Sequence, residues 1–311
     1  MRTRPFARSL PLLPLLTFAL PLAGPVAVAR SEEAKKHGGA VEIWVRKAGG
    51  ERQGLKKLEL DGLPSTEIKR QDVQYEGGTF AYKGVALKAL LAKYAPPASV
   101  DLALLRFANG MLVPLPFRDD AVMARLDPFV ARARVGDGAL RVGEFPSLSR
   151  TNENYVDVKP IAFSGNKLVV ADRFHPDVPA AHAAAFSPWL FADTLVAIEL
   201  VKGSAWYAQF DLEAAGDAHA GALLVRQSCQ YCHGARKVGA SFGWDFVEPI
   251  PAFAVRRTER ALFFHIRYRA ASEQMRGAQM PALKHMTEDD ARKLMAGLRV
   301  IGTRELGPYK P

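Results

Sequence analysis

The sequence of 311 residues contains only two cysteines, Cys229 and Cys232, and both lie in the stretch RQSCQYCHGARK. No second cysteine pair exists, so a zinc site would need its other ligands from dispersed histidines. The chain also lacks internal repeats and low-complexity tracts. Its arginines are scattered, without a basic arm or regularly spaced aromatic residues, so nothing in the sequence indicates a nucleic-acid-binding module.

The first thirty residues have the pattern of an export signal. Three arginines precede the apolar stretch SLPLLPLLTFALPLAGPVAV, and Ala27-Val28-Ala29 supplies the small residues expected before a cleavage site. Four prolines interrupt the apolar stretch, which disfavours a helix retained as a membrane anchor. We therefore expect a signal peptide over residues 1–29 and a periplasmic location.

The net charge of the chain indicates which kinds of partner the protein can approach, but it does not indicate a function. Removal of residues 1–29 takes away three arginines and no acidic residue, which lowers the formal net charge from +10 to +7. A moderately basic exported protein is suited to anionic partners, and peripheral contact with a membrane surface is possible.

The pattern of apolar residues predicts two domains with a boundary near residues 208–214. Residues 30–211 alternate like half-buried strands, and a helix is expected where Val85, Leu87, Leu90 and Leu91 recur. From Leu212 the chain is Ala-rich and helical, with helices expected over 212–229, 259–271 and 287–302. The predicted fold is therefore a mixed, strand-rich α+β domain followed by an all-α domain over residues 212–311.

The spacing of Cys229, Cys232 and His233 is the strongest chemical signal in the chain. Residues three and four apart in a helical segment lie on one face, so both thiols can reach the two vinyl groups along one edge of a haem. The imidazole then lies beneath the ring, and C-x-x-C-H is the signature of this attachment. A disulfide is the alternative, but a redox C-x-x-C should open a helix after a strand, whereas a helix is expected before Cys229. We expect one covalently bound haem c.

Residues 212–302 resemble the class I cytochrome c family. Gly221 stands eight positions before the first cysteine, Gly234 follows the histidine, and GAQMPALKHMTEDDARKLMAGLRVI matches the family's Met-Pro motif and final helix. The resemblance implies that Met280 is the second iron ligand and that the carbonyl of Pro249 or Pro251 holds the other nitrogen of His233. Val225 departs from the family, since many members have an aromatic residue there. Leu294 and Leu298 would then pack against it with aliphatic contacts.

Other residues near Met280 could also bind iron, namely Met275, Met286, Met295, His265 and His285. Only Met280 is followed by proline, which holds the preceding residue extended so that its thioether can project from a loop. Iron with histidine on one side and methionine on the other has no open position, so it would exchange electrons and not bind substrate.

The N-terminal half resembles the molybdopterin-binding fold of the sulfite-oxidase type over roughly residues 40–203. The matching positions are Tyr82, Gly84, Val85, Leu87, Leu90 and Leu91, with a looser match at Ala108-Asn109-Gly110-Met111. Enzymes of that family bind molybdenum through a cysteine thiolate, and residues 30–211 contain no cysteine. The resemblance therefore implies a docking or scaffolding domain without molybdenum.

A set of polar residues in this half forms either a pocket or an ordinary loop. They are Asn152, Glu153, Asn154, Asp172, Arg173 and His175.

These features predict an electron-transfer protein more than an enzyme. It would carry single electrons between a periplasmic dehydrogenase and a terminal acceptor. Two alternatives remain open. In one, the chain is an enzyme of the sulfite dehydrogenase type that oxidises a small anion and passes electrons to the haem. In the other, Met280 leaves the iron to admit a gas, and the protein is a sensor.

Overall fold

The structure is a computed structural model, and it describes most of the chain after residue 38. The described residues are 39–47, 50–73, 79–135, 165–183, 186–190, 192, 194–208, 210, 216–235, 238–248, 250–255, 258–272, 280 and 283–303. The predicted signal peptide and most of the predicted domain boundary near residues 208–214 lie outside the described residues.

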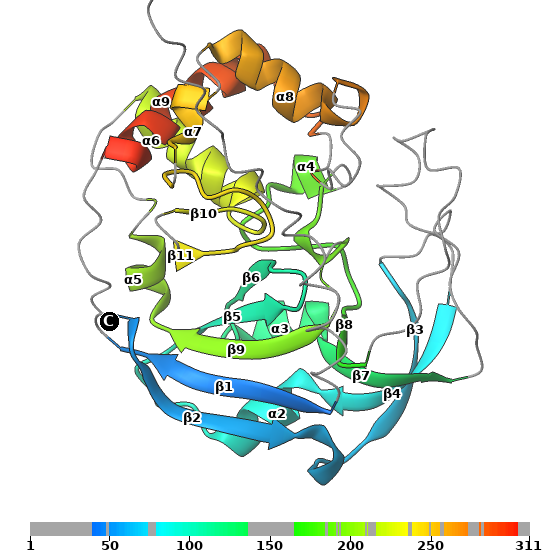
Figure 1. Cartoon of the computed structure of the whole chain (residues 1–311). Coiled ribbons are helices and arrows are strands. Elements are labelled where there is room, and N and C mark those ends of the chain that lie inside the picture. Colours follow the sequence, from blue (N-terminus) through cyan, green and yellow to red (C-terminus); the bar gives the residue numbers. More distant parts are fainter. Residues whose placement is uncertain are drawn as a thin grey trace, which may run out of the picture.

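Two sheets form the lower part of the molecule (Figure 1). The first has five strands in the order β2-β1-β9-β5-β6, formed by Arg52–Glu59, Ala40–Arg46, Leu195–Val201, Leu102–Phe107 and Leu112–Leu115. Strands β1 and β9 are parallel, whereas β1–β2, β5–β6 and β5–β9 are antiparallel. This sheet is therefore mixed, and its central strands are almost entirely buried.

The second sheet has four antiparallel strands in the order β3-β4-β7-β8, formed by Thr66–Gln71, Thr79–Ala86, Phe129–Val135 and Lys167–Val169. Helix α2 (Leu87–Tyr94) follows β4 directly, and α3 (Asp120–Leu126) begins at an Asp119 cap whose carboxylate accepts the Val122 N–H. The strand β4 runs through Gly84 to Ala86. A Cβ at Gly84 would fall 2.1 Å from the carbonyl oxygen of Val130, so this glycine lets β4 and β7 approach closely.

The C-terminal part covers the sheets from above. Its helices are α6 (Asp217–Leu224), α7 (Ala252–Val255), α8 (Glu259–Ser272) and α9 (Glu288–Thr303), and the short strands β10 (Gly234–Ala235) and β11 (Val238–Gly239) lie between these helices and the five-stranded sheet (Figure 1). Helix α9 begins with a capping box, in which Thr287 Oγ1 accepts the Asp290 N–H and Asp290 accepts the Thr287 N–H. The remaining short helices are α4 (Ala180–Ala183) and α5 (Gly203–Tyr207).

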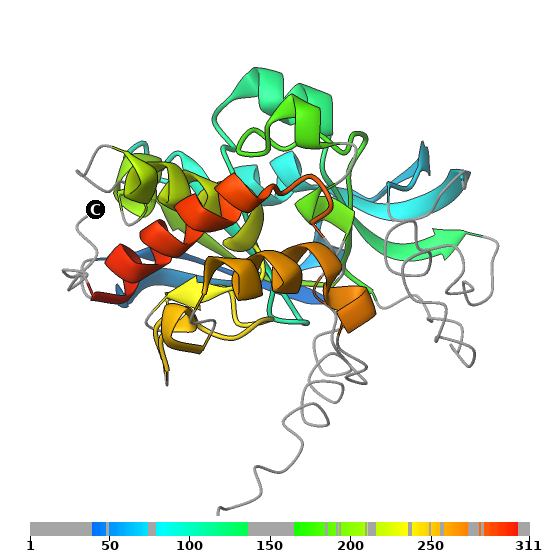
Figure 2. The ribbon, with the colours of Figure 1, turned by 90° about the horizontal axis from the view of Figure 1, so that it is seen from above.

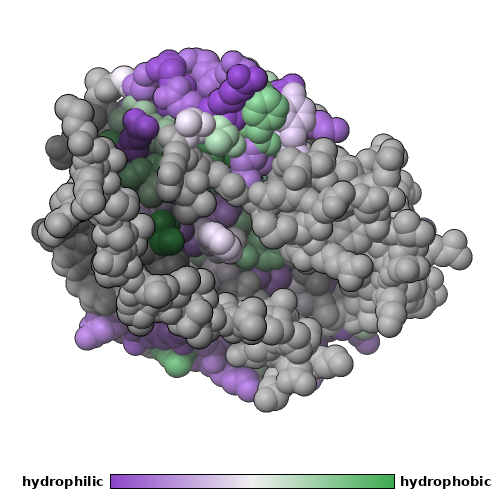
Figure 3. All heavy atoms as spheres, turned by 45° about the horizontal axis from the view of Figure 1, so that its top comes forward, coloured by the Kyte–Doolittle hydropathy of each residue, from purple (hydrophilic) through white to green (hydrophobic). Residues whose placement is uncertain are grey.

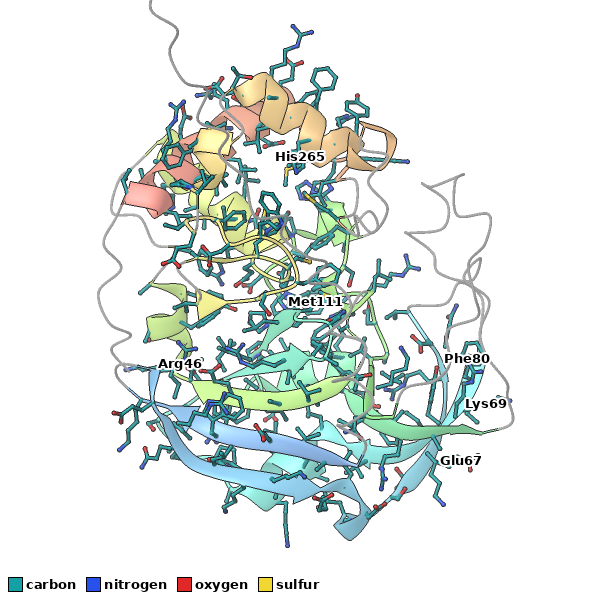
Figure 4. The ribbon with its side chains drawn as sticks, viewed as in Figure 1. Arg46, Glu67, Lys69, Phe80, Met111 and His265 are labelled. Atoms are coloured by element: carbon teal, nitrogen blue, oxygen red, sulfur yellow. The ribbon has the colours of Figure 1, made fainter. Side chains whose placement is uncertain are left out.

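The prediction of a separate all-α cytochrome c domain after an α+β domain is wrong. The described chain is a mixed α/β structure in which residues beyond 212 include the β10–β11 hairpin. One cluster of buried apolar residues runs from Val41 in β1 to Ile301 in α9 and includes both cysteines. Met111, at the turn between β5 and β6, is 1% exposed and lies between the sheet and the C-terminal helices (Figure 4). The apolar faces of both halves thus bury each other instead of forming two cores.

Backbone hydrogen bonds also join the two halves. The Leu112 N–H donates to the Tyr231 carbonyl at 3.0 Å, and the Ser241 N–H donates to the Gly110 carbonyl at 2.7 Å. Gly110 has a φ of +91°, a conformation that suits glycine in the tight turn between β5 and β6. This hairpin of the N-terminal half is therefore one of the surfaces that contact the C-terminal part.

The outer surface of the upper helices is hydrophilic with apolar interruptions (Figure 3). Phe264 and Tyr268 of α8 are the large apolar side chains exposed on this helix. No helix of the described part of the chain combines the length and the apolar character needed to cross a lipid bilayer.

Helices α6 and α9 cross at a pair of glycines (Figure 2). A Cβ at Gly221 would fall 1.9 Å from the Lys293 carbonyl oxygen, and a Cβ at Gly297 would fall 2.6 Å from the Gly221 carbonyl carbon. Only glycine fits at such a backbone approach. Val225, one turn after Gly221, is fully buried and belongs to the same large core cluster as Leu294 and Leu298.

The crossing predicts that Gly221→Ala destabilises the protein by about 1–3 kcal/mol or more, because the added methyl group must push the helices apart. Guanidinium unfolding of the full chain measures the change. Gly62→Ala is the matched control, since no atom lies within 4 Å of a Cβ built at Gly62. Equal stabilities of the two variants would contradict the close crossing.

Candidate functional site

The segment from Val225 to His233 brings the two cysteines and the histidine together. Helix α6 passes into a π-helical turn over Val225–Cys229, and the chain then turns tightly. The Cys229 carbonyl accepts the N–H groups of both Cys232, at 3.1 Å, and His233, at 3.0 Å. The predicted clustering of Cys229, Cys232 and His233 is therefore built from local backbone hydrogen bonds.

The imidazole of His233 is fixed from several directions. Its Nδ1 lies 2.6 Å from the carbonyl oxygen of Trp244, and a carbonyl only accepts, so Nδ1 carries the proton. In the neutral ring Nε2 then carries the lone pair. The Phe246 ring stacks on the imidazole with centroids 4.8 Å apart. A Cβ at Gly243 would fall 2.5 Å from the imidazole Cε1, so glycine is needed there.

The acceptor for His233 differs from the one that the family resemblance implied. Pro249 lies outside the described residues, and the Pro251 carbonyl accepts the Ala254 N–H instead. Trp244 takes this role because the Gly243 N–H donates to the Cys232 carbonyl at 2.7 Å and folds the chain back over the histidine. A carbonyl that orients a histidine in this way fixes its tautomer and raises its basicity as a metal ligand.

Both thiols are buried and protonated. Burial raises the pKa of Cys229 to about 12, and burial together with the nearby Cys229 raises the pKa of Cys232 to about 12. A thiol used for disulfide exchange has a pKa well below the ordinary value, because the thiolate is the nucleophile. This environment is therefore opposite to that of a redox C-x-x-C.

The other predicted iron ligands lie in different surroundings. Met280 is partly buried and packs against the shared core, whereas Met286 and Met295 are core residues with 1% exposure each. His265 lies on α8 (Figure 4), and His285 lies in the turn before α9. Met275 and Pro281 lie outside the described residues.

A small hollow of about 10 Å³, roughly the room of one water molecule, lies beside His233. Its walls include Trp206, Gln230, Phe246 and Ile301. The Trp206 Nε1 donor and the Gln230 Oε1 acceptor are buried there without a hydrogen-bond partner. A donor and an acceptor in one hollow are suited to an ordered water.

A buried polar junction ties the attachment segment to the N-terminal half. The carboxylate of Asp177 accepts the Tyr207 hydroxyl at 2.6 Å, the Arg226 Nη2 at 2.6 Å and the Gln230 Nε2 at 3.3 Å. Arg226 also packs over the Tyr207 ring, with its Cζ 3.6 Å from the centroid. Because Arg226 and Gln230 flank Cys229, Asp177 helps to set the orientation of the cysteine-bearing turn.

His175, which the sequence analysis placed in a polar set, belongs to this junction. Its Nε2 lies 2.8 Å from the Pro114 carbonyl and therefore donates, so Nδ1 accepts the Asp177 N–H at 3.1 Å and the Tyr231 hydroxyl at 3.2 Å. Tyr231 stands between the two cysteines and is fully buried. His175 is thus a neutral structural residue whose hydrogen bonds are satisfied.

The rest of that polar set does not form one site in the described part of the chain. Asn152, Glu153 and Asn154 lie outside the described residues. Asp172 accepts Arg125 Nε at 2.7 Å, and the Arg173 carbonyl accepts the Ser187 hydroxyl. Within the same limits, no group of three or more His, Cys, Asp or Glu side chains is arranged to hold a metal ion.

The buried state of His175 predicts a pH dependence of stability. Burial lowers its pKa from 6.5 to about 4, so between these values the unfolded chain binds a proton that the folded chain does not. The free energy of unfolding should therefore fall as the pH drops, by about 2 kcal/mol between about pH 7 and about pH 5 from this residue alone. Guanidinium unfolding at both pH values measures the slope.

In His175→Gln this part of the slope should disappear, because glutamine can keep the contacts to Pro114 and Asp177 but does not titrate. His219→Gln, which changes a partly exposed histidine of α6, should keep the wild-type slope. Identical slopes in the wild type and His175→Gln would contradict the assignment.

No protein-family model matches the chain, and no curated protein matches it. Functional assignment therefore depends on the chemistry of the site. The site presents two buried neutral thiols and an oriented imidazole on one turn.

Proposed function

We propose that this protein is a periplasmic electron carrier with one covalently attached haem c. Cys229 and Cys232 would form the two thioether bonds, and His233 and Met280 would be the axial iron ligands. When bound, a haem of this kind supplies a one-electron Fe(III)/Fe(II) couple. The observation that carries the proposal is the Cys229–His233 turn, in which Trp244 holds the proton on His233 Nδ1.

The residues present fit this group on three counts. The His233 tautomer leaves the lone pair on Nε2, as an iron-binding imidazole requires. The environment of the thiols disfavours a thiolate redox centre, while buried neutral thiols are compatible with thioether attachment. Gly243 and Phe246 hold the imidazole ring in one orientation. The protein thus holds the His233 imidazole in the orientation that iron binding would need.

The surface beside His233 supports a role in transient docking of redox partners. Trp244, whose carbonyl accepts the His233 Nδ1–H, has a side chain that is 82% exposed. Exposed apolar side chains close to a redox centre allow a partner to approach without a deep interface. A periplasmic dehydrogenase as donor and a terminal acceptor remain the proposed partners.

Covalent attachment is tested by expression of the full chain in a host with a working haem c maturation system. The purified protein should be coloured, keep its pigment in acid acetone and gain the mass of one haem. Cys229→Ala/Cys232→Ala should lose the covalent pigment completely, whereas Ser228→Ala, the matched control next to Cys229, should keep it. Colourless wild-type protein from cells whose own c-type cytochromes mature normally would end the proposal.

The role of Met280 predicts a change in reduction potential. Thioether ligation favours Fe(II), so Met280→Ala should lower the potential and open the iron to carbon monoxide. Met295→Leu, which changes a buried core methionine, should leave both properties close to wild type. Redox titration and carbon monoxide binding to the reduced protein measure these effects. Rapid carbon monoxide binding by the wild type would instead favour the gas sensor.

A further inference from the structure

His182 and His285 form a pair of stacked imidazoles. His182 belongs to α4 and His285 to the turn before α9, and their ring centroids are 4.3 Å apart with the planes inclined by 29°. The turn is held firmly, because the Leu283 N–H donates to the Ile266 carbonyl at 2.8 Å. Arg267 Nη1 donates to the carbonyls of Lys284 and Met286, each at 2.6 Å. Residues far apart in the sequence thus bring two metal-ligating side chains into contact.

Neither ring nitrogen of His285 has a hydrogen-bond partner, although both atoms are buried. An unsatisfied buried polar atom costs about 1–3 kcal/mol, so a native protein leaves one only where something else satisfies it. Burial and the neighbouring His182 lower the pKa of His285 to about 4. The ring is therefore neutral at physiological pH and offers a lone pair.

We propose that His182 and His285 bind a divalent first-row transition-metal ion of the Zn²⁺ or Cu²⁺ class. Neutral imidazole nitrogen is a preferred ligand of these ions. In a tetrahedral zinc site with Zn–N of about 2.0–2.1 Å, two ligand nitrogens lie about 3.3 Å apart. Stacked rings direct their lone pairs within separate planes, so one imidazole must rotate about its side-chain torsions for both nitrogens to reach the same ion. Water would complete the coordination, and His182 is partly exposed, which gives the ion a path of entry.

Two charged groups act on this pair in opposite directions. The Asp290 carboxylate raises the pKa of His285 and so favours a nearby cation, whereas the Arg267 guanidinium opposes one. Both groups have other contacts, Asp290 with Thr287 and Arg267 with the two carbonyls of the turn. The pair is therefore expected to bind an ion through the imidazole nitrogens and not through a carboxylate.

The test uses the untagged full-length protein in its haem-loaded form, treated with chelator and then titrated with ZnCl₂ in a calorimeter. One Zn²⁺ should bind per protein. His182→Ala and His285→Ala should each raise the dissociation constant for Zn²⁺ on the order of tenfold or more. His219→Ala, on α6, is the matched histidine control and should bind as the wild type does. With Cu²⁺, paramagnetic resonance should show coupling to two imidazole nitrogens that is lost in each pair variant.

Three results would overturn the proposal. They are an absence of Zn²⁺ binding by the wild type, equal weakening in His219→Ala, and loss of the haem ligand-field spectrum in His285→Ala, which would make His285 an iron ligand. If His285→Ala fails to fold, the Zn²⁺ affinities of His182→Ala and of the conservative variant His285→Gln are measured instead. The haem spectrum is read separately from Zn²⁺ affinity, so a failure of the metal pair leaves the electron-carrier proposal standing.

Discussion

The arrangement of the two halves depends on the hydrogen bonds that the carboxylate of Asp177 accepts. This carboxylate is buried and negatively charged, so it is tolerated only while Arg226, Tyr207 and Gln230 surround it. Two of these partners flank Cys229, and Asp177 itself follows the His175 that holds Tyr231. The cysteine-bearing turn therefore takes its orientation from a loop about fifty residues earlier. Residues of the N-terminal half therefore help to position the cysteine-bearing turn.

Contacts between residues far apart in the sequence, such as those of Asp177, could not be predicted, whereas local patterns could. The helix near Leu87–Leu91 and the helix over 287–302 were predicted because helical periodicity is a local signal, and the structure has α2 and α9 there. Strand β3 was not predicted because its sequence TEIKRQ is largely exposed and charged. The close strand approach at Gly84 could not be predicted, because only the partner strand reveals it.

The same distinction applies to the site. The clustering of Cys229, Cys232 and His233 could be predicted because three to four residues of helical turn suffice to produce it. The Trp244 acceptor could not, since it depends on the chain folding back through the Gly243 N–H to the Cys232 carbonyl. The separate all-α domain was wrong for a related reason. Helical periodicity shows that a face is apolar, but not which surface covers it.

Two buried carboxylates of the N-terminal half, Glu199 and Asp72, are enclosed by cationic and hydroxyl partners. Glu199, 2% exposed, is paired with Arg46 and Arg106, and its pKa is lowered despite burial because both guanidinium groups stabilise the carboxylate. Asp72 is likewise buried with the Tyr82 hydroxyl at 2.6 Å and Lys167 Nζ at 3.5 Å. Charges so enclosed stabilise one arrangement of strands. A catalytic group instead needs access to substrate and a pKa matched to proton transfer.

Unpartnered polar atoms lie near the cysteine-bearing turn and at the histidine pair. Trp206 Nε1, Gln230 Oε1 and both ring nitrogens of His285 are buried without a hydrogen-bond partner. The His233 imidazole is oriented but remains at the surface of the molecule, next to the exposed Trp244. In the proposed electron carrier, an imidazole that Trp244 already orients would need little rearrangement when the iron changes its oxidation state. The buried Asp177 junction, which helps to fix the neighbouring turn, would serve the same end.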